Sequence, residues 1–304
     1  MRPFDTIPAI VMTVSVGAIA LTPAAAHALT GTEVNDIARE VTVLVNGGVP
    51  GSGVLIAQDG DTYYVLTAKH VVEIDGEYLI VTADQQAHGT TFENIVHFDG
   101  LDLAVVSFES EEDYPIATLA NSNHASEGST VFVSGWPDPG TEIQERIRQF
   151  TTGEVSGRPD NPLEDGYQIV YTNQTFYGMS GGPVFDTDGR VVGIHGRADA
   201  IAGSDEAVQR LQESGNENVD IANNARRNGF NLGIPANTFL SAAPQNGLFL
   251  SLDIENSAPE NPNVAYEDNS DIDDRDRIDN FNATLDTVNN VVDTIQNFRR
   301  VFPF

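Results

Sequence analysis

The sequence predicts an all-β protein made of two packed six-stranded antiparallel β-barrels, followed by a C-terminal helical extension. Short apolar and β-branched runs recur about every ten residues, and turn signals such as Asp59-Gly60-Asp61 and Asp75-Gly76 separate them. Strands at that spacing are typical of sandwiches and barrels. The runs also form two series, which predicts one barrel over about residues 40–125 and a second over 126–243.

The predicted elements can be placed along the chain in order. A short helix is expected over 35–40. The strands expected in the first series are 41–45, 53–57, 63–67, 78–82, 94–98 and 103–108. Those expected in the second series are 131–134, 144–156, 167–171, 183–185 and 190–194. Gly233-Ile234-Pro235 then precedes a final helix that closes the fold.

Charge and cysteine content exclude several classes of function. The formal net charge is -30, from 45 acidic and 15 basic residues, and Lys69 is the only lysine. Phosphate binding needs clustered Lys and Arg, so a nucleic-acid partner is excluded. An acidic surface with one lysine suits a salty medium, in which charges are screened within about 10 Å. The chain has no cysteine, so neither a disulfide framework nor a thiolate metal site is expected.

The N-terminal segment has the pattern of an export signal. Arg2 precedes an apolar stretch over 10–21, and Ala26-His27-Ala28 fits the small-x-small cleavage rule. We therefore expect residues 1–28 to be removed, giving a mature periplasmic or extracellular protein that begins at Leu29. The alternative is an uncleaved membrane anchor, although the apolar run is shorter than the ~20 residues that span a bilayer. Membrane association is not expected after cleavage.

Three separated motifs supply the parts of a nucleophilic site. Gly178-Met179-Ser180-Gly181-Gly182-Pro183 predicts a tight, exposed turn that presents a serine hydroxyl. A serine is a weak nucleophile unless a base activates it and a third group orients that base. Thr67-Ala68-Lys69-His70 and Leu101-Asp102-Leu103-Ala104 supply a histidine and a carboxylate, each beside an apolar run. The first barrel would hold His70 and Asp102, and the second Ser180, which predicts a site between the barrels.

In this order the three motifs resemble those of the chymotrypsin-like (trypsin-fold) serine endopeptidases. The resemblance covers about residues 40–243 and lies closest to the cysteine-free bacterial branch that includes the glutamyl endopeptidases and the high-temperature-requirement proteases. Gly135-Trp136-Pro137 and Gly153-Glu154-Val155-Ser156-Gly157 are also similar to that branch. The resemblance implies a protease domain over 29–250 that acts on protein or peptide substrates and needs no metal or organic cofactor.

The roles that the resemblance implies are chemically consistent. Ser180 would attack the peptide carbonyl, His70 would transfer the proton, and Asp102 would orient the imidazole. The backbone N–H groups of Gly178 and Ser180 would form the oxyanion hole, each worth about 3 kcal/mol. Met179 departs from the Asn or Asp that relatives usually carry, but its side chain is not needed for the hole.

The resemblance also implies a substrate preference. Glutamyl endopeptidases use a threonine five residues before the serine and a histidine fifteen residues after it, which here are Thr175 and His195. Arg197, in His195-Gly196-Arg197, would add positive potential. Gln174 stands where trypsin-like enzymes that cleave after Arg or Lys have an acidic residue. We therefore expect substrate contacts from Gln174, Thr175, His195, Gly196 and Arg197, with cleavage after Glu and less readily after Asp.

Other interpretations stay open at this stage. His70, Asp102 and Ser180 are each ordinary as single residues, and only their joint occurrence in this order favours catalysis. A protease fold that binds peptides without cleaving them is one alternative. A protease that prefers small or apolar residues is another, since Thr175 could be a loop residue and His195 could pack against its strand.

The remaining segments extend the protease domain. Residues 205–227 are polar and predict a solvated insertion. Residues 251–280 have the acidic, Asn- and Pro-rich composition of a disordered linker. Asp271–Asp276 is a poor match to a calcium loop, because Asp276 replaces the glycine that the loop requires. Residues 281–304 repeat apolar side chains every three or four positions, which predicts an amphipathic helix that docks on the protease domain or self-associates.

Overall fold

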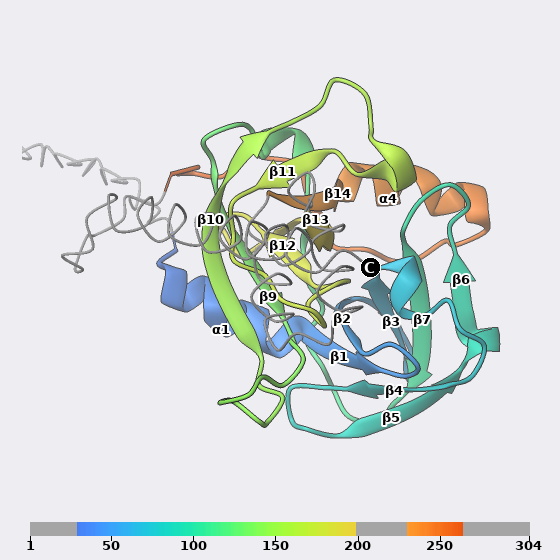
Figure 1. Ribbon diagram of the computed structural model, residues 1–304. Coiled ribbons are helices and arrows are strands. Elements are labelled where there is room, and N and C mark those ends of the chain that lie inside the picture. The colour runs from blue at the N-terminus through green and yellow to red at the C-terminus, as the bar shows by residue number, and fades with distance from the viewer. Residues whose placement is uncertain (1–28, 199–229, 264–304) are drawn as a thin grey trace, which may run out of the picture.

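The computed structural model describes residues 29–198 and 230–263, and these residues form two barrels of antiparallel strands (Figure 1). The predicted all-β class is therefore confirmed. The predicted signal segment 1–28, the insertion 205–227 and the helix 281–304 lie outside the described residues. No helix in the described part is long and apolar enough to cross a membrane.

The N-terminal barrel contains seven strands within the described residues, in the order β5-β4-β1-β2-β3-β7-β6. Thr90 Oγ1 donates to the Ser107 carbonyl at 2.7 Å, which links β5 to β7 and nearly closes the sheet. The strand β5 was not expected, because its residues Ala-His-Gly-Thr-Thr show no apolar alternation. The strands are β1 Thr42–Asn46, β2 Gly51–Asp59, β3 Thr62–Thr67, β4 Glu77–Val81, β5 Ala87–Thr91, β6 Ile95–His97 and β7 Ala104–Glu109.

The C-terminal barrel is closed by pairing. The described strands run in the order β12-β9-β10-β11-β14-β13, and β12 also pairs with β13. Two short strands, β8 and β15, extend the sheet beyond β13 through parallel pairings. The strands are β8 Leu119–Ala120, β9 Thr130–Gly135, β10 Gln149–Gly157, β11 Ile169–Tyr171, β12 Pro183–Phe185, β13 Val191–Ala198, β14 Asn231–Pro235 and β15 Ile254–Glu255.

Alternation along the central strands divides the apolar side chains between a barrel interior and the seam between the barrels. In β2, Leu55 packs with the interior of the N-terminal barrel, whereas Val54 and Ile56 join a separate cluster with Phe132 and Ile234 of the second barrel. Both faces of this strand are therefore buried, which explains its continuous apolar run. The shared cluster fixes the two barrels against each other.

Two α-helices flank the C-terminal barrel within the described residues. Helix α1 (Gly31–Val41) is longer than the predicted helix, and a capping box between Thr30 and Glu33 fixes its start. Its buried face, Val34, Ala38 and Val41, packs with Phe132 and Phe185. Helix α4 (Ala236–Ala242) follows β14 directly and buries Phe239.

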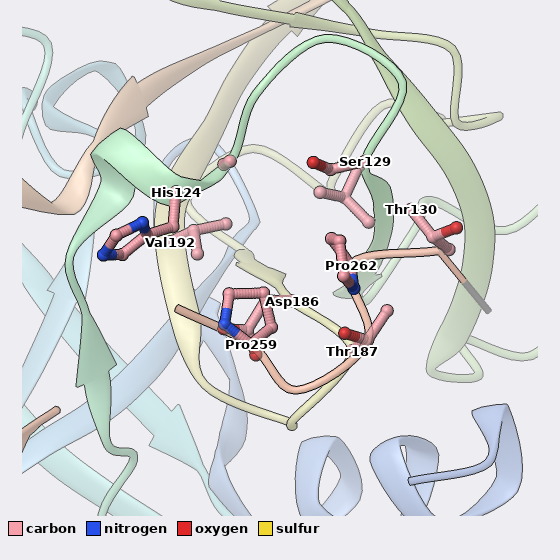
Figure 2. A pocket seen from close by; sticks show the side chains of 10 residues that line it. His124, Ser129, Thr130, Asp186, Thr187, Val192, Pro259 and Pro262 are labelled. Atoms are coloured by element: carbon pink, nitrogen blue, oxygen red, sulfur yellow. The ribbon is translucent and has the colours of Figure 1, made fainter. Parts of the chain in front are cut away.

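Residues 251–263, called the strap below, lie against the C-terminal barrel. They begin the predicted disordered linker, but they are ordered by hydrogen bonds to the barrel. β15 pairs with β8, Thr187 Oγ1 donates to the Asn261 carbonyl at 2.6 Å, and Thr130 N–H donates to the Pro262 carbonyl at 2.9 Å. Pro259 and Pro262 cover a cavity of about 10 Å³ beside Asp186 and Thr187 (Figure 2). Composition missed this segment because backbone groups, rather than apolar side chains, hold it.

Candidate active site

His70 and Asp102 meet at one end of the N-terminal barrel. The helical turn η1 (Lys69–Val71) follows β3 and carries His70, while Asp102 lies in the loop between β6 and β7. Asp102 Oδ2 is 2.7 Å from His70 Nδ1, and Asp102 Oδ1 accepts the backbone N–H of His70 at 2.9 Å. The imidazole is 40% exposed and the carboxylate only 12%. The carboxylate thus holds both the ring and the backbone of His70, and the ring remains open to a substrate.

A third group binds the same carboxylate. The hydroxyl of Tyr167, which lies just before β11 in the C-terminal barrel, donates to Asp102 Oδ2. Burial alone would raise the pKa of Asp102, but the hydrogen bonds and charge of His70, together with the Tyr167 hydroxyl, hold it below its ordinary value. Asp102 is therefore a carboxylate at neutral pH.

Ser180 lies in the turn between β11 and β12 of the C-terminal barrel. The turn requires glycine at Gly181, where φ is +85° and a Cβ would collide with the Ser52 carbonyl and the Thr67 hydroxyl. Ser180 Oγ donates to the Gly196 carbonyl at 2.7 Å. In the described part of the chain, no hydrogen bond joins Ser180 Oγ to His70.

Two peptide planes around the serine are oriented by hydrogen bonds. The Tyr177 carbonyl accepts the Asp138 N–H at 2.7 Å, and the Met179 carbonyl accepts the Gly182 N–H at 3.0 Å. Because C=O and N–H point in opposite directions across a trans peptide, the N–H groups of Gly178 and Ser180 point away from these partners. Within residues 29–198 and 230–263, neither N–H donates a hydrogen bond. Two oriented amide donors are thus available beside the serine.

Thr175, in the loop after β11, and His195, in β13, belong to a buried polar cluster of the C-terminal barrel. Thr175 Oγ1 donates to Asn231 Oδ1 at 2.5 Å. Across the barrel wall, the hydroxyl of Tyr171 lies 2.7 Å from His195 Nδ1. Asn231 and Tyr171 are register partners of β14 and β11, so they connect the two pairs. Burial raises the pKa of Tyr171 well above its ordinary value, so its hydroxyl keeps its proton.

The other predicted substrate-binding residues lie outside this cluster. Gln174 is exposed. Arg197 stacks its guanidinium over the Tyr167 ring, 4.6 Å from the centroid, and lies 3.8 Å from Asp165. The register of β13 against β14 shifts between His195 and Arg197. Sequence spacing alone could not place Arg197 away from His195, because the bulge changes the register. Gly196, between them, contributes the carbonyl that accepts from Ser180.

A hollow of about 400 Å³ opens beside His70 and Asp102. Its lining mixes both signs of charge, with Lys69 and Arg197 facing Glu73 and Asp165, around an apolar wall from Leu101 and Tyr167. The hollow is large enough for one or two amino-acid side chains. In the described part of the chain, no group of three or more His, Asp or Glu residues could hold a metal ion.

Four contributors to the site were not predicted from the sequence: Tyr167, Tyr171, Asn231 and Ser52. Ser52 Oγ donates to the Gly178 carbonyl at 2.8 Å and accepts the Trp136 N–H at 2.8 Å, which holds the segment before the nucleophile against β2. The glycine-rich pattern around Ser52 was a signal for close backbone approach. Tyr171 and Asn231 look like ordinary strand residues, and only the sheet register shows what they contact. Tyr167 precedes β11, and its contact with Asp102 depends on how the two barrels pack.

The fold and site geometry agree with a comparison to known families, in which residues 51–194 match the family described as "Trypsin-like peptidase domain". This stretch is therefore similar in sequence to trypsin-like peptidase domains, and the relatives below are described as serine proteases. The "Probable periplasmic serine endoprotease DegP-like" of Chlamydia pneumoniae is 30% identical over 151 residues, which covers 48% of this chain and 28% of the relative.

Further relatives are of the same type. The "Serine protease Do-like HtrA" of Bacillus subtilis (strain 168) is 31% identical over 155 residues, covering 48% of this chain and 32% of the relative. The solved structure "HtrA-type protease AlgW with tripeptide" has a TM-score of 0.54 at 19% identity, covering 71% of this chain and 63% of that one, and shows the shared fold. These matches do not support the glutamyl endopeptidase branch and indicate HtrA-type relatives instead. The chain spans about a third of the length of these curated relatives.

Proposed function

We propose that the chain is a serine endopeptidase in which Ser180 is the nucleophile, His70 the general base and Asp102 the group that orients His70. The observation that carries this proposal is the hydrogen-bonded pair of His70 and Asp102. The glycine turn of Ser180 comes close to the segment before His70, because a Cβ at Gly181 would lie 2.9 Å from the Ala68 nitrogen. The family match over residues 51–194 supports the same reaction class.

The proposed reaction begins when the Ser180 hydroxyl turns from the Gly196 carbonyl toward His70. Oγ bonds to the substrate carbonyl carbon while its proton moves to His70 Nε2. The tetrahedral intermediate then breaks its C–N bond, and the same proton goes to the leaving amine. Water repeats the sequence on the acyl-enzyme, which releases the acid and restores the serine.

The oxyanion formed in each half of this reaction needs donors that do not reorganise. We assign this role to the N–H groups of Gly178 and Ser180, whose peptides are already held by Asp138 and Gly182. Donors fixed in advance stabilise developing charge without a reorganisation cost. The contacts of Ser52 with Gly178 and Trp136 support the same segment from β2.

The test is peptide cleavage and covalent labelling by a fluorophosphonate probe. Wild-type protein should cleave a mixed peptide library and bind the probe, whereas Ser180→Ala should do neither. The expected loss of kcat is on the order of 10⁵-fold or more. Ser241→Ala, a serine on the exposed side of α4, is the matched control and should behave as wild type. Folded wild-type protein that binds peptides but neither cleaves them nor reacts with the probe would instead indicate a silent binding module.

We further propose that the side chain before the cleaved bond is acidic, as the sequence pattern suggested. Support comes from the cluster of Thr175 and His195. If Tyr171 donates to Nδ1 of His195, the neutral imidazole carries its proton on Nε2, and an imidazole N–H is a donor of the kind that carboxylates accept. Hydrogen bonds to a charged group are about twice as strong as neutral ones, so this donor would favour Glu or Asp.

The peptide library tests this preference separately from catalysis. We expect His195→Asn to lose at least about tenfold in kcat/KM for cleavage after Glu, with little change after small residues. His88→Asn, in β5 of the other barrel, is the control. A wild-type preference for small or apolar residues would reject the acidic pocket while leaving the proposed triad intact.

We also propose that the protein is exported, with residues 1–28 removed. Its DegP-like relatives carry the description periplasmic, and the sequence pattern at Ala26-His27-Ala28 agrees. Cell fractionation and N-terminal sequencing test this proposal, with Leu29 as the expected first residue. A cytoplasmic protein that retains residues 1–28 would contradict it.

A further inference from the structure

We propose that Tyr167 is a positioning residue of the catalytic pair: its hydroxyl holds and partly neutralises the Asp102 carboxylate from the opposite barrel. This inference rests on the proposed roles of His70, Asp102 and Ser180. It goes beyond them, because it assigns to the C-terminal barrel a direct part in setting the strength of the base in the N-terminal barrel.

The hydrogen bonds around Asp102 carry the inference. Oδ2 accepts from His70 Nδ1 at 2.7 Å and also from the hydroxyl of Tyr167, while Oδ1 accepts the His70 N–H. Tyr167 has no exposed surface. Burial, and then the charge of Asp102, raise the pKa of Tyr167, so the hydroxyl remains a donor throughout the pH range of activity. The carboxylate is thus held by donors from both barrels.

Space for the Tyr167 hydroxyl is made at Gly196. A Cβ at residue 196 would overlap the phenol oxygen and ring of Tyr167, so every other amino acid there collides with it. Gly196 also presents its carbonyl to Ser180. The absence of a side chain at residue 196 therefore lets Tyr167, which lies just before β11, reach the carboxylate of Asp102 in the other barrel.

Charged side chains surround the Tyr167 ring. The Arg197 guanidinium lies 4.6 Å from the centroid of the Tyr167 ring and 3.8 Å from Asp165. The Asp102 N–H donates to the Asp165 carbonyl at 2.9 Å. The other titratable groups that border this region are Lys69 and Glu73, which line the hollow beside His70, and Tyr171, which also raises the pKa of Tyr167. Arg197 thus covers one face of the phenol ring, and Gly196 lies beside its hydroxyl end.

The consequence is a shift in the proton affinity of the His70 and Asp102 pair. A hydroxyl that donates to Oδ2 withdraws negative charge that the imidazole would otherwise experience. Without it, the pair binds a proton more tightly, and acid inactivates the enzyme at higher pH. The carboxylate also loses an orienting contact, so kcat falls while substrate binding, measured by KM, changes little.

The experiment uses Tyr167→Phe in the full chain, assayed for kcat, KM and the pH dependence of kcat/KM. We expect kcat to fall by about tenfold or more, as for loss of a hydrogen bond to a charged group. The midpoint of the acidic limb should move up by about half a pH unit. Tyr63→Phe is the matched control, because it removes a buried hydroxyl that donates to the Glu112 carbonyl, away from Asp102. It should leave the acidic limb in place.

A second variant separates positioning from packing. Because a Cβ at residue 196 would point into the space of the Tyr167 phenol, a serine hydroxyl there can replace it once the ring is removed. Tyr167→Ala/Gly196→Ser should therefore recover kcat relative to Tyr167→Ala. Wild-type kcat and pH profile in Tyr167→Phe, or an equal loss at every pH that follows lost stability, would overturn the inference. Activity retained in Ser180→Ala would reject the proposed triad instead.

Discussion

Asn231 lies at the centre of the buried polar cluster that contains Thr175, and its amide orientation determines which groups of the cluster donate and which accept. Its amide nitrogen donates to the Asn173 carbonyl, so the amide oxygen faces the Thr175 hydroxyl. Asn231 is 2% exposed, and no charged group among the described residues forms a hydrogen bond with it. A carboxylate at this position would be close in shape and opposite in its effect on an acidic substrate.

We predict that Asn231→Asp reverses the proposed preference. The added negative charge repels Glu and Asp and attracts Lys and Arg, so kcat/KM for cleavage after Glu should fall by about tenfold or more. Individual peptides that differ in one residue provide the measurement. Asn246→Asp, on an exposed turn after α4, adds the same charge elsewhere and should change nothing. An unchanged preference in Asn231→Asp would show that acidic side chains do not reach this cluster.

The proposed catalytic residues were easier to predict from the sequence than the residues that position them. His70, Asp102 and Ser180 each follow or precede a clear apolar strand or glycine turn, so their motifs stand out along the chain. Tyr167, Tyr171 and Asn231 act through partners 24 to 65 residues away, at places fixed by strand register or by the packing of the two barrels. The bulge in β13 moved Arg197 to Tyr167 for the same reason. Spacing along the sequence does not encode these contacts.

At the scale of elements, the turn between β12 and β13 contains a buried ion pair. Arg190 Nε donates to Asp186 Oδ2 at 3.0 Å, and Arg190 Nη1 donates to the Ser257 carbonyl of the strap at 3.2 Å. Burial raises the pKa of Asp186 despite its hydrogen bonds with Arg190 and Asp188. Burial thus outweighs these hydrogen bonds in setting the pKa of Asp186. Buried ion pairs of this kind add little net stability, so the pair serves mainly to define the turn and its contact with the strap.

We predict that Asp186→Ala lowers the free energy of unfolding by about 3 kcal/mol, because it leaves the buried Arg190 charge with Asp188, at 3.1 Å, as its carboxylate partner. Urea denaturation followed by circular dichroism gives the value. Asp36→Ala removes an exposed pair with Arg39 in α1 and should cost less than about 1 kcal/mol. Asp186→Leu/Arg190→Met removes both charges and should be more stable than Asp186→Ala. Equal losses in the three variants would contradict the buried-charge argument.

Elements differed in how well the sequence predicted them. Strands with apolar side chains on both faces, such as β2, were found because burial demands a continuous apolar run. β5, β8, β15 and the strap were missed, since cross-strand backbone hydrogen bonds hold them and any sequence can supply those. The predicted run 144–156 included residues before Gln149, which belong to the connection from β9. Apolar patterning therefore identifies strands that bury side chains in the core, and it misses strands that only backbone hydrogen bonds hold in place.

At the scale of the whole molecule, the large negative net charge affects both stability and substrate binding. A net charge of -30 over 304 residues makes the folded chain repel itself and repel acidic peptides. Screening shortens the range of this repulsion from about 30 Å at 0.01 M salt to about 3 Å at 1 M. Stability and catalysis should therefore both depend on ionic strength.

We predict that raising sodium chloride from about 0.01 M to 1 M increases the free energy of unfolding, on the order of 1 kcal/mol or more, because self-repulsion is screened. KM for an acidic peptide should fall over the same range, and KM for a neutral peptide should change less. Thermal denaturation and steady-state kinetics measure these two effects. Stability that falls with salt would mean that attractive ion pairs outweigh the repulsion.

Asp102 is bound by residues of both barrels, and this has a consequence for chains that are still folding. The Asp102 carboxylate accepts the Tyr167 hydroxyl, and the Asp102 N–H donates to the Asp165 carbonyl, only when the two halves have docked. A newly made copy in which only the first half has formed has the pair of His70 and Asp102 but lacks both Tyr167 and the serine. We expect such a copy to be unable to digest its neighbours, so newly synthesised chains are protected from one another until each is complete.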